Sequence, residues 1–412
     1  MKNLFCIFFI IKITNCFSQG VWTQKASFPG TARGDAFSFS IGTKGYIGGG
    51  CDTSGGYVND FWEYDALNNI WTQKANFGGL ARWQAVAFSI GLKGYVGTGQ
   101  DGSSAFHNDL WEYNSSANSW MQKASMPTLG RNLAVGFSIG NKGYIGSGQW
   151  GNPAYRHSDF WQYNPATNTW VGKANIPGAR SFAVGLAIDG KGYIGTGLDS
   201  LTANFRDDFW EYDTLTDTWV QKLNFPGGTR IDIDGAHFAI SNYVYIGSGR
   251  SLVSGLWVYY NDFWKYNPSN DTWTQIPNLP AIARLGASSF SINNKGYIGL
   301  GFWYNNFQNY LNDLWEYTDT TKVVAINEIK INVSTEIFPN PLTAATTIRM
   351  NSAADFKDER LKLFDVSGKT IREEGFSGKQ IILKRESIES GVYFYQIISD
   401  NKIIAEGKLV VQ

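Results

Sequence analysis

The feature that most constrains this chain is a repeat of about 49 residues. Its clearest mark is a Gly-Tyr-Ile-Gly-x-Gly phrase, with small variations, followed by an aromatic phrase such as NDFWEYD at Asn59–Asp65 and then by a lone Trp. The six glycine-rich phrases span Gly45–Gly50, Gly94–Gly99, Gly143–Gly148, Gly192–Gly197, Val244–Gly249 and Gly296–Gly301. Paired glycines and spaced aromatic residues at this period are typical of a four-stranded propeller blade, so the sequence predicts an all-β ring of blades.

Two series of Trp residues show how the ring closes. The expected fourth strands carry Trp22, Trp71, Trp120, Trp170, Trp219 and Trp273, and the expected third strands carry Trp62, Trp111, Trp161, Trp210, Trp264 and Trp315. The series are out of phase, because Trp22 precedes every glycine-rich phrase and no Trp follows Asn312–Thr318. Val21–Lys25 nearly copies Ile70–Lys74, so we expect six blades closed by this N-terminal strand, which removes exposed sheet edges.

One arginine precedes each glycine-rich phrase. The six are Arg33, Arg82, Arg131, Arg180, Arg230 and Arg284. Together with the glycine and Trp patterns, they resemble kelch repeats of the galactose-oxidase-like superfamily over about residues 19–318. The resemblance implies blades whose strands run outward from the centre, starting just after the arginine. It does not fix an activity, because kelch propellers include enzymes, adaptors and glycan binders.

The N-terminus has the pattern of an export signal. Residues 1–18 combine a short basic start, the apolar run Leu4–Ile11 and small residues before a cut at Gln19, so we expect a signal peptide. The apolar run is too short to span a bilayer. A lipidated Cys16 is the alternative. The mature chain would keep Cys51 as its one cysteine, so no intramolecular disulfide is expected.

The C-terminal part is different in kind. A linker is expected at residues 319–333, and residues 334–412 alternate apolar and polar positions like a small immunoglobulin-like β-sandwich. The phrases IFPNP at Ile337–Pro341, LKLFDVSGKTI at Leu361–Ile371 and GKLVVQ at Gly407–Gln412 resemble the type A sorting domain of the Bacteroidetes type IX secretion system. The resemblance implies a secreted protein that meets this machinery, loses the domain, and is displayed on the cell surface or released. An ordinary terminal module is the alternative.

Charge and residue counts exclude some functions. Lys plus Arg and Asp plus Glu both number 35, so we expect no nucleic acid partner. No pair among His107, His157, His237 and Cys51 has metal-ligand spacing. We therefore expect no metal and no cofactor, and copper-dependent galactose oxidase activity is disfavoured.

The repeat also separates blade residues from ligand residues. A residue found in every blade belongs to the blade, so we expect the six arginines to pair with the six aspartates that open the third strands. Off-template aromatic residues map to loops at one end of the ring, beside polar groups suited to a neutral glycan. The candidate ligand-binding residues are Trp83, Trp150, Tyr155, Trp257, Tyr259, Trp303 and Tyr304. In the alternative interpretation, these loops pack their own rings to stay ordered.

The predicted function is that of an exported propeller acting as a non-catalytic binding module, for carbohydrate or a partner protein. The enzyme alternative is a sugar epimerase or mutarotase that uses Arg230, Asp232, Asp234 and His237 for proton transfer; Asp232 and Asp234 are the one carboxylate cluster at a first strand. A structural surface protein with no small ligand is the third possibility.

Overall fold

The computed structural model describes residues 20–151, 154–199, 204–231, 235–305, 307–320, 333–352, 358–365, 369–399 and 402–412. Among these residues the regular elements are all β-strands, which confirms the predicted fold class. The chain divides into two compact units, Met1–Thr321 and Lys322–Gln412. The expected signal peptide, residues 1–18, and most of the expected linker lie outside the described residues.

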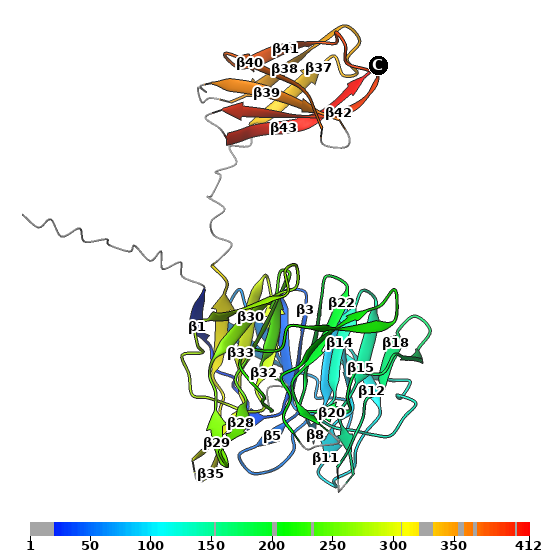
Figure 1. Cartoon of the computed structure of the whole chain (residues 1–412), viewed down its shortest axis with the longest axis vertical. Coiled ribbons are helices and arrows are strands. Elements are labelled where there is room, and N and C mark those ends of the chain that lie inside the picture. Colours follow the sequence, from blue (N-terminus) through cyan, green and yellow to red (C-terminus); the bar gives the residue numbers. More distant parts are fainter. Residues whose placement is uncertain are drawn as a thin grey trace, which may run out of the picture. The chain divides into compact units, whose positions relative to one another are not determined.

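The first unit is a ring of six four-stranded antiparallel sheets, the blades of a propeller (Figure 1). Blade one contains β3 (Phe37–Ile41), β4 (Lys44–Gly48), β6 (Phe61–Asp65) and β7 (Ile70–Lys74). Blade two contains β9 (Val86–Ile90), β10 (Lys93–Gly97), β12 (Leu110–Asn114) and β13 (Ser119–Lys123). Blade three contains β14 (Val135–Ile139), β15 (Lys142–Gly146), β18 (Phe160–Asn164) and β19 (Thr169–Lys173). Blade four contains β21 (Val184–Ile188), β22 (Lys191–Gly195), β24 (Phe209–Asp213) and β25 (Thr218–Lys222). Blade five contains β26 (His237–Ile240), β27 (Tyr243–Gly247), β30 (Phe263–Asn267) and β31 (Thr272–Ile276). Blade six contains β32 (Ser288–Ile292), β33 (Lys295–Gly299), β36 (Leu314–Thr318) and β1 (Val21–Lys25).

The N-terminal strand β1 closes the ring. It pairs with β36 along its whole length, from Val21 opposite Thr318 to Lys25 opposite Leu314. The Trp22 indole N–H donates to the carbonyl of Pro277 in blade five at 2.8 Å, and Trp71 of blade one donates in the same way to Ala26, just after β1, at 3.0 Å. The last blade therefore depends on a strand from the other end of the propeller sequence.

The core lies between neighbouring blades, and the glycine-rich phrases explain how the blades approach. A Cβ on Gly94 would stand 2.2 Å from the ring of Phe39 in blade one, and the first glycine of the blade three, four, six and one phrases faces a Phe of the preceding blade in the same way. In blade five the glycine is replaced by Val244 and the preceding Phe by Leu186, and both lie in one buried cluster. The first glycine of these five phrases thus leaves room for the Phe ring of the preceding blade.

The arginine and aspartate series pair within each blade, as the repeat predicted. All six arginines are at most 1% exposed. In blade four, for example, Arg180 donates from Nη1 and Nη2 to the two oxygens of Asp208 at 2.7 and 2.8 Å, and Nη1 also donates to the carbonyl of Thr196 at 3.1 Å. The second oxygen of Asp208 accepts the indole N–H of Trp210 at 2.8 Å. A buried bidentate pair with satisfied carbonyl and indole partners is a structural clasp.

The second unit is a two-sheet β-sandwich. One sheet contains β37 (Ser334–Phe338), β38 (Ala345–Asn351) and β41 (Gln380–Lys384), and the other contains β40 (Thr370–Phe376), β39 (Glu359–Phe364), β42 (Gly391–Ser399) and β43 (Lys402–Val411). Its core is mainly aliphatic and includes Ile348, Leu363, Leu383 and Ile397, all fully buried, together with Tyr395. This unit therefore has a hydrophobic core of its own.

Candidate functional site

Six short ribbons decorate one end of the propeller, which we call the loop face. They are β2 (Arg33–Gly34) with β5 (Cys51–Asp52), β8 (Arg82–Trp83) with β11 (Gln100–Asp101), β16 (Gln149–Trp150) with β17 (Tyr155–Arg156), β20 (Arg180–Ser181) with β23 (Leu198–Asp199), β28 (Arg250–Val253) with β29 (Leu256–Tyr259), and β34 (Phe302–Asn305) with β35 (Phe307–Tyr310). Figure 1 shows β5, β8, β11, β28, β29 and β35 gathered at the same end of the ring. All seven candidate ligand-binding residues belong to these ribbons.

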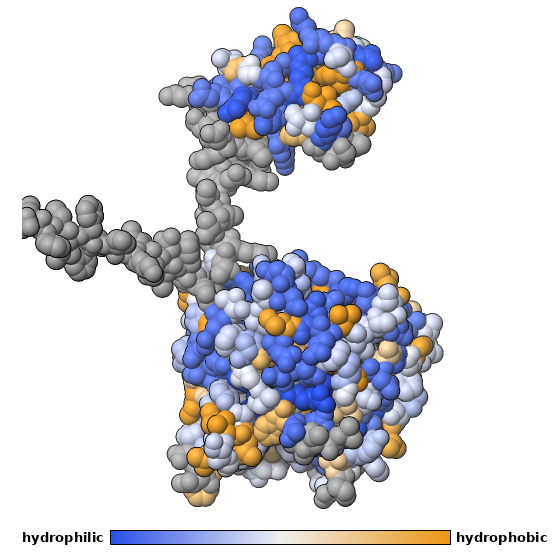
Figure 2. All heavy atoms as spheres, viewed as in Figure 1, coloured by the Kyte–Doolittle hydropathy of each residue, from blue (hydrophilic) through white to orange (hydrophobic). Residues whose placement is uncertain are grey.

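Several of these aromatic side chains are open to solvent. The exposed fraction is 42% for Trp150 and Trp257, 43% for Tyr304 and 62% for Tyr155. Phe307, on the same ribbon as Tyr304, is 79% exposed. Hydrophobic atoms are visible at the end of the propeller where Figure 1 places β28, β29 and β35 (Figure 2). Exposed rings and aliphatic side chains gathered at one place are typical of an interaction surface.

The candidate residues differ in how far neighbouring groups cover them. Trp257 also stacks on Phe205 of the neighbouring blade, with ring centroids 5.8 Å apart, and the Arg250 guanidinium lies 4.1 Å from its ring. Tyr259 lies opposite Arg250 and is partly buried, as is Trp303. The loop face therefore combines rings that pack on one another with rings that solvent reaches, so each sequence interpretation describes part of it.

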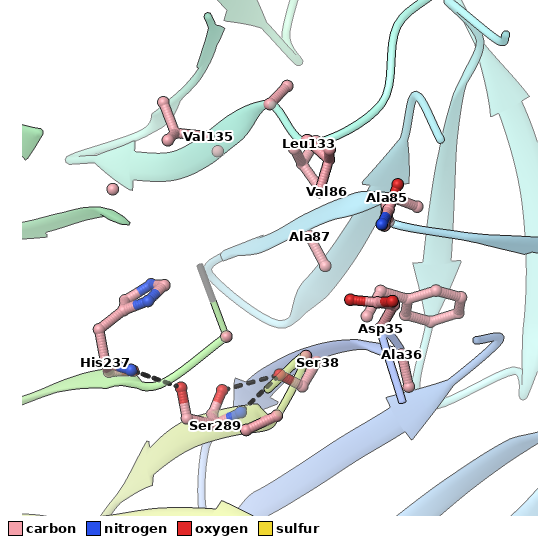
Figure 3. A pocket seen from close by; sticks show the side chains of 18 of the residues that line it. Asp35, Ala36, Ser38, Ala85, Val86, Ala87, Leu133, Val135, His237 and Ser289 are labelled. Atoms are coloured by element: carbon pink, nitrogen blue, oxygen red, sulfur yellow. Dashed lines mark hydrogen bonds between the residues drawn. The ribbon is translucent and has the colours of Figure 1, made fainter. Parts of the chain in front are cut away.

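A narrow central cavity opens among the first strands. It measures about 100 Å³ and its lining includes Asp35, Ser38, Gln84, His237 and Ser289. Ser289 accepts the backbone N–H of His237 through its hydroxyl at 3.4 Å, and Ser38 donates to the carbonyl of Ser289 at 2.8 Å. Figure 3 shows His237 and Asp35 on different sides of this cavity. A space of this size holds a few water molecules, whereas small-molecule sites usually measure about 300–1,000 Å³.

Of the other residues of the enzyme alternative, the structure describes Arg230. Arg230 is buried and its guanidinium is committed to Asp262, with Nη1 2.7 Å from Oδ1, and to the carbonyl of Ser248 at 2.9 Å. Asp232 and Asp234 lie outside the described residues. His237 is thus the one member of this set that the structure describes at the central cavity.

Residues at the mouth of the cavity share an unusual backbone conformation. Asp35, Gln84 and Leu133, which line the cavity, have φ of 53° or 54°, and Phe182, at the same place in blade four, has φ of 59°; each lies two residues after a clasp arginine. Their backbones form hydrogen bonds around the mouth: Asp35 N–H to the Gly286 carbonyl at 2.8 Å, and Gln84 N–H to the Asp35 carbonyl at 3.0 Å. The conformation repeats although the side chain changes, so the backbone at these positions serves the ring whichever side chain it carries.

Sequence reasoning missed a second pocket, which we call the amide pocket. It lies on the loop face at blades two and three and measures about 490 Å³. The residues lining it are Trp83, Gln84, Gln100, Ser104, Phe106, Asn132, Leu133, Gln149, Gly151 and Phe182. Gln84 and Asn132 occupy positions where other blades carry unrelated residues, so a template comparison extended from tryptophans to amides would have found them.

Titratable groups lie close to this pocket without entering its lining. His107 is 2.9 Å from Asp101, whose pKa is lowered to about 2, chiefly by the hydroxyl of Ser103. Burial lowers the pKa of His157, and the nearby Arg131 adds to the effect. Arg156 donates from Nε to the Ser181 hydroxyl at 3.0 Å. The lining itself carries no charged side chain, which favours a neutral ligand.

Within the described ranges, no group of three or more His, Cys, Asp or Glu side chains is placed to hold a metal ion. The Cys51 sulfur lies 3.3 Å from the Tyr310 hydroxyl. In the part of the chain that the structure describes, no helix has the length and hydrophobicity needed to cross a membrane.

Comparison with known proteins agrees with the two-part architecture. Residues 251–280 match the kelch motif, and residues 336–412 match the secretion system C-terminal sorting domain. The solved structure of YjhT, a kelch β-propeller, superposes with a TM-score of 0.60 at 18% identity, covering 70% of this chain and 95% of that one. At this identity the likeness concerns the fold.

Curated relatives match over a shorter stretch. The N-acetylneuraminate epimerase of Shigella sonnei (strain Ss046) is 35% identical and that of Escherichia coli (strain K12) 34% identical, each over 86 residues. Each match covers 21% of this chain and 23% of the relative's length. The chain is a kelch-repeat β-propeller with a secretion system C-terminal sorting domain, which indicates export by type IX secretion to the cell surface or the extracellular space.

Proposed function

We propose that the exported propeller is a non-catalytic binding module whose loop face holds a carbohydrate or a partner protein. The observation that carries the proposal is the gathering of solvent-exposed rings, Trp150, Tyr155, Trp257 and Tyr304, on ribbons at one end of the ring. These rings stand outside the blade template, so the blades do not need them. Aromatic faces beside amide and hydroxyl groups suit both sugar rings and protein partners.

Binding by full-length protein to a glycan array and to an extracellular protein panel tests the proposal. We expect Trp257→Ala or Tyr304→Ala to reduce binding at least tenfold while the thermal midpoint stays within about 2 °C of the parent, because these side chains lie outside the blade cores. Leu215→Ala is the matched control, since Leu215 is 92% exposed in a turn between β24 and β25, away from the loop face. Equal binding by all variants would contradict binding at these aromatic side chains, and no binding by the parent would favour a structural surface protein.

The second candidate is a sugar epimerase or mutarotase. It is supported by the relatives named N-acetylneuraminate epimerase and by His237 at the central cavity. The small volume of that cavity and the commitment of Arg230 to Asp262 favour the binding module. NMR of N-acetylneuraminate with and without protein separates the two: faster interconversion of its epimers, lost in His237→Ala, would establish the enzyme.

A further inference from the structure

We infer that the amide pocket on blades two and three is a subsite for one ring of a neutral sugar. This inference rests on the proposed function and gives its binding face a specific place and ligand class. The apolar face of the sugar would stack on Trp83, and a sugar hydroxyl would donate to Oδ1 of Asn132. The pocket volume, about 490 Å³, lies within the range of small-molecule sites.

Trp83 is held in place with one face available. Its other face stacks on Tyr57 of blade one, with ring centroids 5.6 Å apart and planes inclined by 15°. The indole N–H donates to Oε1 of Gln100 at 3.3 Å, which fixes the rotation of the ring. Trp83 lines the pocket, so a ligand there would stack on the face opposite Tyr57. A fixed aromatic platform loses little conformational entropy on binding.

Asn132 supplies an acceptor that the protein leaves unused. It is 3% exposed, and its Oδ1 has no hydrogen-bond partner among the residues that the structure describes. The orientation of the amide is fixed by Nδ2, which donates to Oε1 of Gln84 at 2.8 Å and to Oε1 of Gln100 at 3.3 Å. Because both N–H groups of Nδ2 are used by Gln84 and Gln100, Oδ1 is the atom of the Asn132 amide that can accept a hydrogen bond from a ligand. A buried acceptor without a partner is costly, so a ligand hydroxyl or N–H would be favoured there.

The neighbouring amides offer donors to complete the site. Gln84 and Gln149 both line the pocket; Oε1 of Gln84 accepts from Asn132, and Oε1 of Gln149 accepts from the Ser181 hydroxyl at 3.1 Å. Among the described residues, neither Nε2 donates to a protein group. The pocket thus presents one acceptor, two amide donors and a ring, without charge. Sugar hydroxyls both donate and accept, and their ring C–H faces are apolar, so a neutral sugar complements all of these groups.

The test measures binding of methyl glucoside, methyl galactoside, methyl mannoside and N-acetylglucosamine to the full chain by titration calorimetry and by quenching of Trp fluorescence. Glucuronate and adenosine are the acidic-sugar and nucleobase arms. We expect at least one neutral sugar to bind saturably and better than both. Trp83→Ala and Asn132→Leu should each weaken this binding about tenfold or more, whereas the exposed-turn control Leu215→Ala should leave it unchanged.

A second variant guards against misfolding of Asn132→Leu. Gln84→Asn shortens the side chain that holds Asn132, and Asn tolerates the φ of 53° at this position, so folding should be preserved while sugar binding falls. Binding that survives Gln84→Asn and Asn132→Leu but is lost in Trp257→Ala overturns the pocket and keeps the proposed function. Preference for glucuronate or adenosine overturns the neutral-sugar assignment. No sugar binding in the parent overturns the subsite, and the protein panel then decides the proposed function separately.

Discussion

At the residue scale, the clasp arginines show why a repeated charge differs from a ligand-binding one. Each guanidinium is buried and divides its donors between an aspartate and backbone carbonyls of its own blade, as Arg180 does with Asp208 and Thr196. Removing one partner of such a pair leaves the other buried without compensation. These arginines therefore act on stability, and their presence in every blade is explained without a ligand.

Arg180→Met is expected to lower the free energy of unfolding by about 3 kcal/mol, because the buried Asp208 carboxylate would lose its bidentate partner and keep only the more exposed Arg206, whose Nη1 lies 3.5 Å from Oδ2. Chemical denaturation followed by Trp fluorescence measures this change. Lys222→Met in the same blade is the control, since Lys222 forms a partly exposed pair with Glu211 at 3.7 Å and should contribute about 1 kcal/mol or less. Equal effects of the two substitutions would contradict the clasp.

The clasps also predict acid sensitivity. Burial alone would raise the pKa of the carboxyl groups of Asp60, Asp159, Asp208 and Asp313, but their arginine and Trp partners outweigh it and hold each pKa below its ordinary value. A depressed folded-state pKa contributes stability that is fully present above the unfolded value, about 3.9, and is lost as the pH falls through the folded value. Thermal midpoints should therefore be level near neutrality and fall below about pH 4, where the parent approaches Arg180→Met. Rising stability below pH 4 would oppose this view.

The separation along the chain between contacting residues explains which site residues could be predicted from the sequence. The off-template tryptophans were found because a large ring is conspicuous against a repeat. The amide pocket was not, because Gln84 and Asn132 are 48 residues apart and meet only across two blades. Their meeting depends on side-chain directions at a backbone with positive φ, which no local pattern specifies.

At the element scale, blades are matched through pairs of facing residues. The Phe of one first strand occupies the space that a Cβ would need at the next blade's glycine, as Phe39 does at Gly94. Between blades four and five, Leu186 is smaller than the usual Phe and Val244 is larger than the usual glycine, so the space between these blades stays filled. The six-blade phase, and the closing strand read from the copied phrase Val21–Lys25, were predictable because they depend on this local repeat.

A double-mutant cycle tests the matching of blades four and five. Leu186→Phe alone should destabilise by about 1–3 kcal/mol through overpacking against Val244, and Val244→Gly alone by a similar amount through lost packing. The double variant restores the Phe–Gly pairing of the other blades, so we expect its stability to be within about 1 kcal/mol of the parent. Additive losses in denaturation experiments would show that the two positions are not coupled.

Closure of the ring gives a prediction for β1. Trp22→Ala removes the hydrogen bond to Pro277 and ring contacts with Phe263 and Tyr317, whose centroids lie 5.0 and 4.9 Å away. We expect a loss of about 3 kcal/mol in the free energy of unfolding, and a larger loss on deletion of residues 19–26, which also exposes the edge of β36. The comparison variant is Trp150→Ala, on the loop face, with a change of about 0.5 kcal/mol or less. Parent-like stability of the deletion would rule out a structural role for β1.

At the scale of the whole molecule, the end of the propeller is fastened before the sorting domain begins. In every blade except blade five, a Glu or Gln of the third strand is hydrogen-bonded to the Tyr hydroxyl of the second strand. In blade one, for example, Glu63 accepts from Tyr46 at 2.7 Å. Blade five carries Lys265 there, and Asp319 accepts instead from Tyr245 while lying 2.6 Å from the Lys265 ammonium. Asp319, where the linker was expected to start, is thus bound to the propeller.

This fastening predicts what processing leaves behind. We expect protein from native cells to begin near Gln19 and to end between Thr320 and Val333, because removal of residues 334–412 takes away a unit with its own core and breaks none of the contacts of Asp319. Intact-mass spectrometry of the surface or released form measures both ends. A recombinant chain ending at residue 333 should unfold at the same midpoint as the propeller of the full chain, and one ending at residue 318 should unfold earlier, since Lys265 and Tyr245 would lose Asp319. A native product that retains Met1 or Gln412, or that ends before Asp319, would contradict this account of how the two units are joined and separated.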